Sequence, residues 1–599
     1  MTTDTTRTVR IGGASGFWGD TALAPAQLVE KGDVDYLIFD FLAEVTMSLL
    51  AKARERSAEA GYAPDFVQML TPLLPQIAEQ NIKVIANAGG VNLNACRAAL
   101  EEACAAQGVS LSIGTVEGDN LLDEVEFIRS EGVTELETGE ALPDKILSMN
   151  AYLGAFPIAA ALDAGADIVI TGRCVDSALA LGPLIHEFVW HPNNYNRLAQ
   201  GSLCGHLLEC GTQATGGNFT DWQDVAGGWD DMGYPIATVF EDGSFDISKP
   251  DDTGGLISPL SVGEQMLYEI GDPGSYMLPD VTCDFRRVTL TQAGDNRVHV
   301  TGARGRMPGD DLKVSATYMD GFKSTPSMLI VGVDAIKKAR AAEAALMNRT
   351  RRLFDEQGLG DFERVYSEFV GNEGFYGAQS RLDDDQVREV VLRLNLHHRN
   401  KKALELFSRE FMGTYLSMTT GRSGLESGRP RVSPLIRLFS FFYDREKIDA
   451  IVSVDGEDIG YDHIATMTLS ESVSSQLPTP KGIKLKGNVV DVPLIKLAVA
   501  RSGDKGDSAN IGIMARKAEY LPAIRASLTA DQVKAYFSHY SEGPVERFDL
   551  PGINGLNFLL HRVLGGGGMA AMRIDTQGKT YAQLLLDIPV TVPASWGLN

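Results

Sequence analysis

Short apolar runs alternate with helix-like segments over the first 240 residues. The runs are apolar at successive positions, whereas the segments between them space their apolar residues three or four positions apart. Successive apolar positions are typical of strands buried on both faces, and helices are the usual crossovers between parallel strands. Residues 1–240 are therefore predicted to form a parallel α/β core. Its strands are VRIGG (9–13), DYLIFD (35–40), IKVIANAGG (82–90), LSIGTVEGDN (111–120) and DIVITGR (167–173).

Helical patterns follow three of these strands directly. FLAEVTMSLLAKARERSAEAG continues from DYLIFD without a gap, which predicts a helix that begins at Asp40. Asp40 and Glu44 would then lie one turn apart on the same helix face. A second helix is predicted from the apolar spacing that starts at Leu93, and a third over DSALALGPLIHEF (176–188).

Residues 241–469 show a different pattern. RVHVTGARG (297–305) and KVSATYMDG (313–321) alternate apolar and polar residues, as strands with one exposed face do. DAIKKARAAEAALMNRTRRLFDEQG (334–358) is amphipathic and predicts a long helix. We interpret this part as an α+β second region of the core.

A linker and a small C-terminal unit are predicted after it. Residues 470–489 are rich in serine and proline and have little to bury. Residues 490–599 predict an α+β domain, which we expect to be separable from a soluble core. Its predicted elements are strand PLIKLAVARSG, helix LPAIRASLTADQVKAYFSHY, strand VERFDLP, helix NGLNFLLHRVLGGG and strand AQLLLDIPV.

The net charge of the chain opposes two classes of partner. The chain has a formal net charge of -25, spread along its length, which opposes binding to nucleic acid and to anionic membranes. No run approaches the ~20 apolar residues of a membrane helix, and the first residues lack a signal-peptide core. We expect a cytoplasmic protein with six reduced cysteines. No ligand-spaced cluster predicts a metal site, and His397 and His398 are interpreted as a surface pair.

Polar and glycine residues follow every predicted strand of the core. Because ligands of parallel α/β sheets bind beyond the carboxyl ends of the strands, these residues are expected to line one rim. The candidate catalytic residues are Asp40, Glu44, Asp119, Arg173 and Asp176. The candidate substrate-binding residues of the rim are Gly13, Ser15, Gly16, Asn87, Gly89, Gly90 and Asn92.

Two of these candidates also have purely structural interpretations. Asp40 and Glu44 could form a carboxyl pair in which one pKa is raised for acid–base work, or Asp40 could cap a helix while Glu44 is solvated. Arg173 follows a buried strand and needs a partner. That partner could be Asp176, Asp119 or an acidic group of a ligand.

Two further glycine-rich segments contribute candidates. ECGTQATGGNFTDW (209–222) could bind an anion through its backbone N–H groups, and Cys210 within it is either a nucleophile or an inert buried thiol. ARSGDKGDSANIG (500–512) places two cations beside glycines, as a phosphate site or as a domain-docking surface. The substrate-binding candidates here are Gln213, Thr215, Gly216, Gly217, Asn218, Arg501 and Lys505.

Six segments together resemble the acyclic terpene utilisation (AtuA) family over nearly the whole chain. They are IGGASGFWGD, DYLIFDFLAEVTMSLLAKAR, VIANAGGVN, DIVITGRCVDSALALGPL, CGTQATGGNFTDW and AVARSGDKGDSANIG. The resemblance implies a ferredoxin-like C-terminal domain and a place in the degradation of citronellol- and geraniol-type acids as coenzyme A thioesters. It implies no catalytic residues, so the site residues above rest on the strand ends alone.

Two functions of different classes follow from the resemblance. The first is a lyase or hydratase that acts on a 3-hydroxyglutaryl-CoA type thioester, with coenzyme A as part of the substrate and no tightly bound cofactor. The second is a non-catalytic partner of an acyl-CoA carboxylase, and in either case we expect a homo-oligomer. A third function, a nicotinamide oxidoreductase, depends on the glycines of IGGASGFWGD, whose spacing does not match G-x-G-x-x-G.

Overall fold

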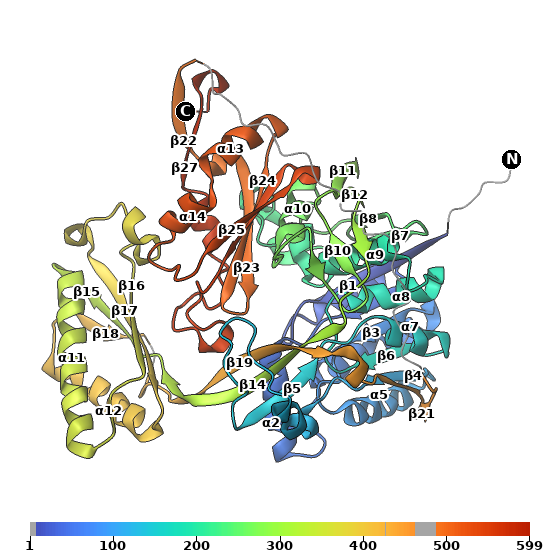
Figure 1. The fold of residues 1–599 in the computed structure, drawn as a ribbon, viewed down its shortest axis with the longest axis horizontal. Helices are drawn as coiled ribbons and strands as arrows, with labels where there is room; N and C mark the ends of the chain where they lie inside the picture. Colours follow the sequence, from blue (N-terminus) through green and yellow to red (C-terminus); the bar gives the residue numbers. More distant parts are fainter. Residues whose placement is uncertain (1–6, 426, 462–486, 599) are drawn as a thin grey trace.

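The computed structural model describes residues 7–425, 427–461 and 487–598. A mixed eleven-stranded sheet, here called sheet A, organises the first part of the chain (Figure 1). All five predicted core strands are present, and they lie parallel at the centre of the sheet. In spatial order they are β1 (Thr8–Ser15), β2 (Tyr36–Phe39), β3 (Lys83–Ala86), β6 (Ile168–Thr171) and β4 (Ile113–Glu117).

Antiparallel strands extend both edges of this parallel centre, so the sheet is mixed rather than all-parallel. β7 (Ile236–Phe240) pairs with β1, followed by β8 (Phe245–Ser248), β12 (Arg297–Thr301) and β11 (Thr289–Gly294). β20 (Ile451–Val454) pairs with β4, and β21 (Glu457–Asp458) pairs with β20. The expected boundary at residue 240 thus lies between two strands that pair with each other.

Helices cover both faces of sheet A, because its central strands are apolar on both faces. Tyr36 and Ile38 of β2 pack into one apolar cluster, while Leu37 and Phe39 pack into another. The first face is covered by α7 (Phe156–Asp163), α8 (Ala178–Phe188) and α9 (Tyr195–Leu208). The second is covered by α1 (Leu23–Lys31), α3 (Pro64–Leu70), α4 (Leu74–Gln80) and α5 (Leu93–Gln107).

The helix expected to begin at Asp40 begins four residues later. α2 spans Glu44–Arg56, and Ala43 occupies its N-cap position. Asp40 therefore lies before the helix and does not cap it, so Asp40 and Glu44 do not share one helix face. The side chain of Glu44 lies outside the described part of the structure.

A second sheet connects the core around sheet A to a separate lobe (Figure 1). The long strands β14 (Asp311–Ser324) and β19 (Ser433–Asp444) pair with each other, and β5 (Ile146–Ala151) pairs with β14. Figure 1 shows the lobe at the far end of this ribbon, with the predicted long helix as α11 (Ala335–Gln357) and with α12 (Lys401–Ser417). Its other strands are β15 (Ser327–Val331), β16 (Arg364–Val370), β17 (Glu389–His398) and β18 (Arg422–Gly424).

The prediction of a histidine surface pair is wrong. His397 and His398 end β17 and are both buried. The Nε2 atom of His397 lies 2.6 Å from the carbonyl oxygen of Asp320, and Nδ1 of His398 accepts from the backbone N–H of Asn400 at 2.8 Å. Adjacent positions of a strand point to opposite faces, and here both faces are covered.

A four-stranded antiparallel sheet forms the centre of the C-terminal unit. Its order is β23 (Ala498–Lys505), β24 (Ser508–Ala515), β26 (Gly555–Leu560) and β25 (Val545–Leu550), and α13 (Leu521–Ser527) and α14 (Ala530–Tyr536) pack with it. The segment NGLNFLLHRVLGGG, predicted as a helix, contains β26. The segment AQLLLDIPV, predicted as a strand, divides between α15 (Tyr581–Leu585) and β27 (Pro589–Pro593), which pairs with β22 (Val489–Pro493).

The C-terminal unit packs tightly on the core. Both oxygens of the Asp221 carboxylate accept from the guanidinium of Arg516, and the Asn510 side chain donates to Leu267 O at 2.7 Å. An added Cβ at Gly512 would lie 2.3 Å from Cβ of Leu267, so the two surfaces are in full contact. The predicted linker, residues 470–489, lies outside the described residues apart from 487–489. Across the described ranges, no helix is both long and apolar enough to cross a membrane.

Candidate acid–base site between the core and the C-terminal domain

The carboxyl ends of β2 and β3 hold Asp40 and Asn87 together. The Asn87 side chain is fully buried and donates from Nδ2 to Oδ1 of Asp40 at 2.5 Å. Its Oδ1 atom accepts from the backbone N–H of Phe41 at 2.6 Å. Asn87 therefore fixes the position of the Asp40 carboxyl, and both lie at the rim that the strand ends predicted.

Asp119 and Arg173 meet at the ends of β4 and β6. Oδ2 of Asp119 accepts from the backbone N–H of Arg173 and from Nδ2 of Asn150, both at 2.8 Å. The Arg173 guanidinium donates to Oδ1 of Asp176 at 2.6 Å and lies 4.2 Å from the centre of the Tyr152 ring. Burial raises the pKa of Asp119 to about 6, against the effect of its hydrogen bonds. Asp119 and Arg173 therefore position each other, and Arg173 also presents Asp176.

Two acidic residues that the sequence analysis missed complete the rim. Glu209 follows α9, and its Oε1 atom lies 3.1 Å from Nδ1 of His206. Glu269 follows α10 (Pro259–Leu267), and its Oε1 atom accepts from Nζ of Lys579 at 2.8 Å. Helix ends carry no pattern that marks them as parts of a site, so only the tertiary fold reveals these residues.

The hairpin of β23 and β24 inserts Lys505 into this acidic surrounding. Its Nζ atom lies 5.3 Å from the centre of the Tyr276 ring. Burial disfavours the ammonium form, but attraction to Tyr276, Glu269 and Glu209 outweighs burial and raises the pKa of Lys505 above its usual range. Lys505 is therefore a permanent cation at neutral pH, and it is a counter-charge rather than a base or a nucleophile.

Asp40, unlike Lys505, favours its neutral form. Burial and the negative charge of Asp176 raise the pKa of Asp40 well above its usual value, although Arg173 and the hydrogen bond from Asn87 partly oppose this. Burial likewise raises the pKa of Glu209, against the attraction of His206. The cluster thus contains a carboxyl that can hold a proton beside Asp176, a carboxylate paired with a guanidinium. An acid and a base in one cluster are what proton-transfer chemistry requires.

Cys210 lacks the environment of a nucleophile. Burial, together with the negative charges of Glu209 and Glu269, raises the pKa of its thiol well above the usual value. A thiol must ionise to attack, so this environment favours the inert alternative.

The glycines of the rim contact protein atoms on the side where a side chain would lie. An added Cβ would lie 2.5 Å from Leu208 O at Gly13, and 3.1 Å from the Cys210 backbone at Gly16. At Gly89 and Gly90 the nearest backbone oxygens would lie at 2.8 and 2.5 Å. The first glycine turn therefore packs on the end of α9, which leaves no space on that face for a dinucleotide pyrophosphate.

Ser15 and Asn92 also bond to protein groups. Ser15 donates from Oγ to Phe17 O at 3.2 Å. Asn92 caps α5 and donates from Nδ2 to Ala58 O and Ala60 O. Their roles in substrate binding, like those of the rim glycines, stay predictions.

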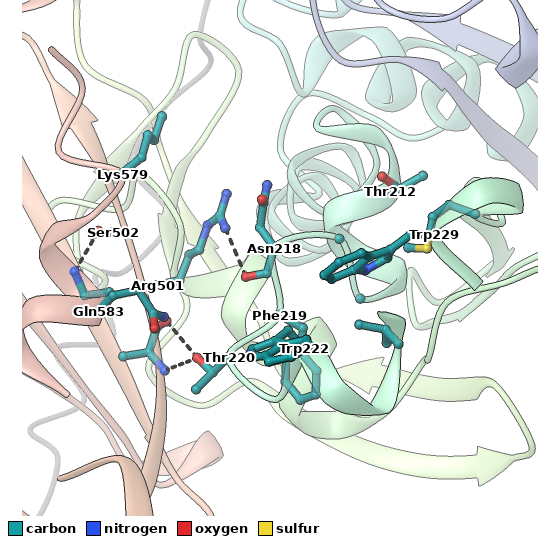
Figure 2. A pocket seen from close by; sticks show the side chains of 16 residues that line it. Thr212, Asn218, Phe219, Thr220, Trp222, Trp229, Arg501, Ser502, Lys579 and Gln583 are labelled. Carbon is teal, nitrogen blue, oxygen red and sulfur yellow. Dashed lines mark hydrogen bonds between the residues drawn. The ribbon is translucent and has the colours of Figure 1, made fainter. Parts of the chain in front are cut away.

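The second glycine cluster and Arg501 meet across the domain boundary. The Arg501 guanidinium donates to Asn218 O at 3.3 Å and to the side-chain oxygen of Gln213. Thr215 is buried and donates to Gly233 O at 2.6 Å, while Gly216, at φ +98°, turns the chain toward Gly217. A cavity of about 520 Å³ opens beside this contact, and Figure 2 shows that residues of both domains line it.

The arrangement therefore joins the predicted candidates into two neighbouring parts. Asp40, Arg173, Asp176 and Lys505 belong to the cluster at the strand ends, with Glu209 and Glu269. Asn218, Gly216, Gly217 and Arg501 line the cavity, and Lys579 connects the two parts because it both lines the cavity and pairs with Glu269. Over residues 7–425, 427–461 and 487–598, no three His, Cys, Asp or Glu side chains are grouped so that they could hold a metal ion.

Comparison with known proteins gives two family matches. The family model described as acyclic terpene utilisation family protein AtuA matches residues 9–454. The model described as AtuA ferredoxin-like domain matches residues 492–591, which identifies the four-stranded C-terminal unit as that domain. No curated protein and no solved structure matches the chain significantly.

Proposed function

From the premise that this chain belongs to the acyclic terpene utilisation family, we propose that it is an acid–base lyase or hydratase acting on a 3-hydroxyglutaryl-CoA type thioester. The observation that carries the proposal is the cluster at the strand ends. There Asp40, a carboxyl with a raised pKa, lies beside the Arg173–Asp176 ion pair, and the cation of Lys505 faces the same acids.

The lyase reaction uses each of these groups once. Asp176 accepts the proton of the 3-hydroxyl group, and the C2–C3 bond breaks as the hydroxyl carbon becomes a ketone. The bonding electrons pass into the thioester carbonyl, and the resulting enolate oxygen is stabilised by the Lys505 ammonium. Asp40 in its protonated form donates a proton to C2, which releases acetyl-CoA.

A hydratase would use the same groups in another order. Asp176 would remove a proton from C2, and Asp40 would protonate the departing 3-hydroxyl group, so that water leaves and a double bond forms. Both reactions need one acid, one base and a counter-charge for the enolate, and the cluster offers all three.

The test is to incubate the purified protein with 3-hydroxy-3-methylglutaryl-CoA and to separate the products. Acetyl-CoA would identify a lyase, and 3-methylglutaconyl-CoA would identify a hydratase. Asp40→Asn and Lys505→Met should each reduce kcat by about 10²–10⁴.

Lys517→Met is the matched control. Like Lys505, Lys517 lies over a tyrosine ring, in this case Tyr520, but it is exposed and outside the cluster. It should leave kcat unchanged. If the wild-type protein shows no turnover and instead co-purifies with an acyl-CoA carboxylase, the enzyme proposal is wrong and the role of non-catalytic partner takes its place.

A further inference from the structure

Two tryptophans are exposed on one side of the interdomain cavity. Trp222 lies in η4 (Trp222–Asp224) and Trp229 in η5 (Ala226–Asp231), and their ring centres are 6.1 Å apart. Their exposed fractions are 52% and 54%. Their ring planes are tilted by 33°, and the two exposed rings offer apolar faces on which a planar ring can stack.

Cations from the C-terminal domain lie on the opposite side. Figure 2 shows the Arg501 guanidinium reaching toward Asn218, whereas Lys579 lies farther from the tryptophans. The Nζ atom of Lys579 pairs with Glu269 at 2.8 Å and with Asp504 at 3.1 Å. The contacts of Arg501 are with neutral groups: the Gln213 side chain, the Asn218 carbonyl and the Tyr268 ring, 5.0 Å from the guanidinium. Its Nε atom is buried and has no hydrogen-bond partner.

Glu264, an acid that interacts electrostatically with Arg501, favours its neutral form. Glu264 is buried and accepts from the backbone N–H of Thr220 at 3.1 Å. Burial raises its pKa to about 8, although the attraction of Arg501 opposes this. The guanidinium charge is therefore available to an anion, in a chain that otherwise carries a net charge of -25.

We propose that this cavity binds the nucleotide end of the coenzyme A thioester, with the adenine ring stacked on the Trp222–Trp229 pair and the phosphates at Arg501. A volume of about 520 Å³ suits a mononucleotide, and aromatic rings beside cations are the usual means of holding a base and its phosphates. The choice of coenzyme A, rather than another adenine nucleotide, rests on the proposed function.

A series of contacting side chains connects this cavity to the acid–base cluster. Tyr268 contacts both Arg501 and Lys579, and Lys579 pairs with Glu269 at 2.8 Å. Glu269 in turn is one of the acids that hold Lys505 charged. The proposed nucleotide site and the proposed reaction site are therefore connected through contacting side chains.

Hydrogen bonds across the domain boundary keep the two walls in place. The Thr220 hydroxyl donates to Ala500 O at 3.2 Å and accepts from Ala500 N at 3.1 Å. Arg516 holds Asp221, the residue before Trp222, through both carboxylate oxygens. The tryptophan side and the cation side are thus joined before any ligand arrives.

The experiment measures binding of free coenzyme A, adenosine 3′,5′-bisphosphate and pantetheine to the full chain by calorimetry and by tryptophan fluorescence. We expect the first two to bind and to quench the fluorescence. Trp222→Leu, Trp229→Leu and Arg501→Gln should each weaken both nucleotides about tenfold or more, and should leave pantetheine unaffected.

Phe127→Leu and Arg562→Gln are matched controls, because they remove an exposed aromatic ring and an exposed guanidinium outside the cavity. Equal nucleotide affinity in the cavity variants and the wild type would overturn the proposal. So would turnover of a pantetheine thioester by a protein that binds no nucleotide, and this result would leave the proposed reaction standing. Nucleotide binding without any turnover would support the cavity assignment and count against the proposed reaction.

Discussion

Arg173 shows how one side chain at the rim depends on its neighbours. The residue is buried, its backbone N–H holds Asp119, and its guanidinium holds Asp176 while stacking on Tyr152. Asp176, Asp119 and a ligand were the three candidate partners of its charge, and in the structure the guanidinium pairs with Asp176. Arg173 is therefore a positioning residue whose guanidinium orients Asp176, whereas the backbone N–H that holds Asp119 stays in any variant with an L-residue other than proline at this position.

Arg173→Ala should lower the free energy of unfolding by about 2–3 kcal/mol. A fully buried pair would lose ~3–5 kcal/mol when one partner is removed, but the Asp176 side chain is 34% exposed and water partly screens its charge. Urea unfolding of the two proteins measures the difference. An unchanged stability together with lost activity would instead make Arg173 a direct ligand contact.

Glu264 should make stability depend on pH. Its folded-state pKa of about 8 lies above the unfolded value near 4.5, so folding takes up a proton between these two values. Stability should therefore fall as pH rises from 5 to 8, by at most about 1.4 kcal/mol per pH unit from this group. Glu264→Gln should remove this slope. Unfolding free energies at pH 5, 7 and 9 test it, and parallel curves for the two proteins would contradict it.

At the scale of elements, the parallel centre of sheet A was predictable and its surroundings were not. Each of its five strands is apolar at successive positions, which is the pattern of a strand buried on both faces. β26 was mistaken for a helix because Asn557 lies between apolar residues. Its side chain is buried and donates to Ile270 O and Gly271 O of the core, so the polar position marks a domain contact and not an exposed face.

The candidate site, too, was only partly predictable from the sequence. Asp40, Asp119 and Arg173 follow strands and could be found by that rule alone. Glu209 and Glu269 follow helices, and they reach the rim only because α9 and α10 end beside it. Lys505 was recognised as a cation near glycines, but its acidic neighbours come from segments more than 200 residues away in the chain.

Gly13→Ala should lower the free energy of unfolding by about 1–3 kcal/mol. The new methyl group would lie 2.5 Å from Leu208 O, and neither β1 nor the end of α9 can move away without disturbing the sheet. Thermal unfolding measures the effect. Gly309→Ala is the control, since an added Cβ there meets no atom within 4 Å, and an equal melting temperature for Gly13→Ala and the control would refute the packing role.

At the scale of the whole molecule, the candidate site is formed by residues of both domains. The core supplies the carboxyl groups and the tryptophans, and the C-terminal domain supplies Lys505, Arg501 and Lys579. The linker-like composition of residues 470–489 predicts a separable C-terminal unit. In the structure, Val499, Met514, Leu550 and Ile553 of that unit belong to the same apolar cluster as the helices of the core.

A chain that ends at residue 486 should therefore be poorly soluble or melt at a lower temperature than the full protein. The truncation uncovers Leu267 and the rest of the apolar surface that β23 and β24 cover. Size-exclusion chromatography and thermal unfolding measure the outcome. A monodisperse truncated core with an unchanged melting temperature would show that the contact contributes no stability.

The pairing of β20 with β4 has a consequence for the order in which the molecule is made. Glu117 pairs with Ile451, and more than 300 residues separate them. On a ribosome that adds about 5–20 residues per second, the outer edge of β4 waits roughly 17–67 s for its partner. During that time the nascent chain exposes an unpaired apolar strand, a template for wrong pairing with other chains. The return of β20 late in the chain thus closes an edge of sheet A that stays open through much of synthesis.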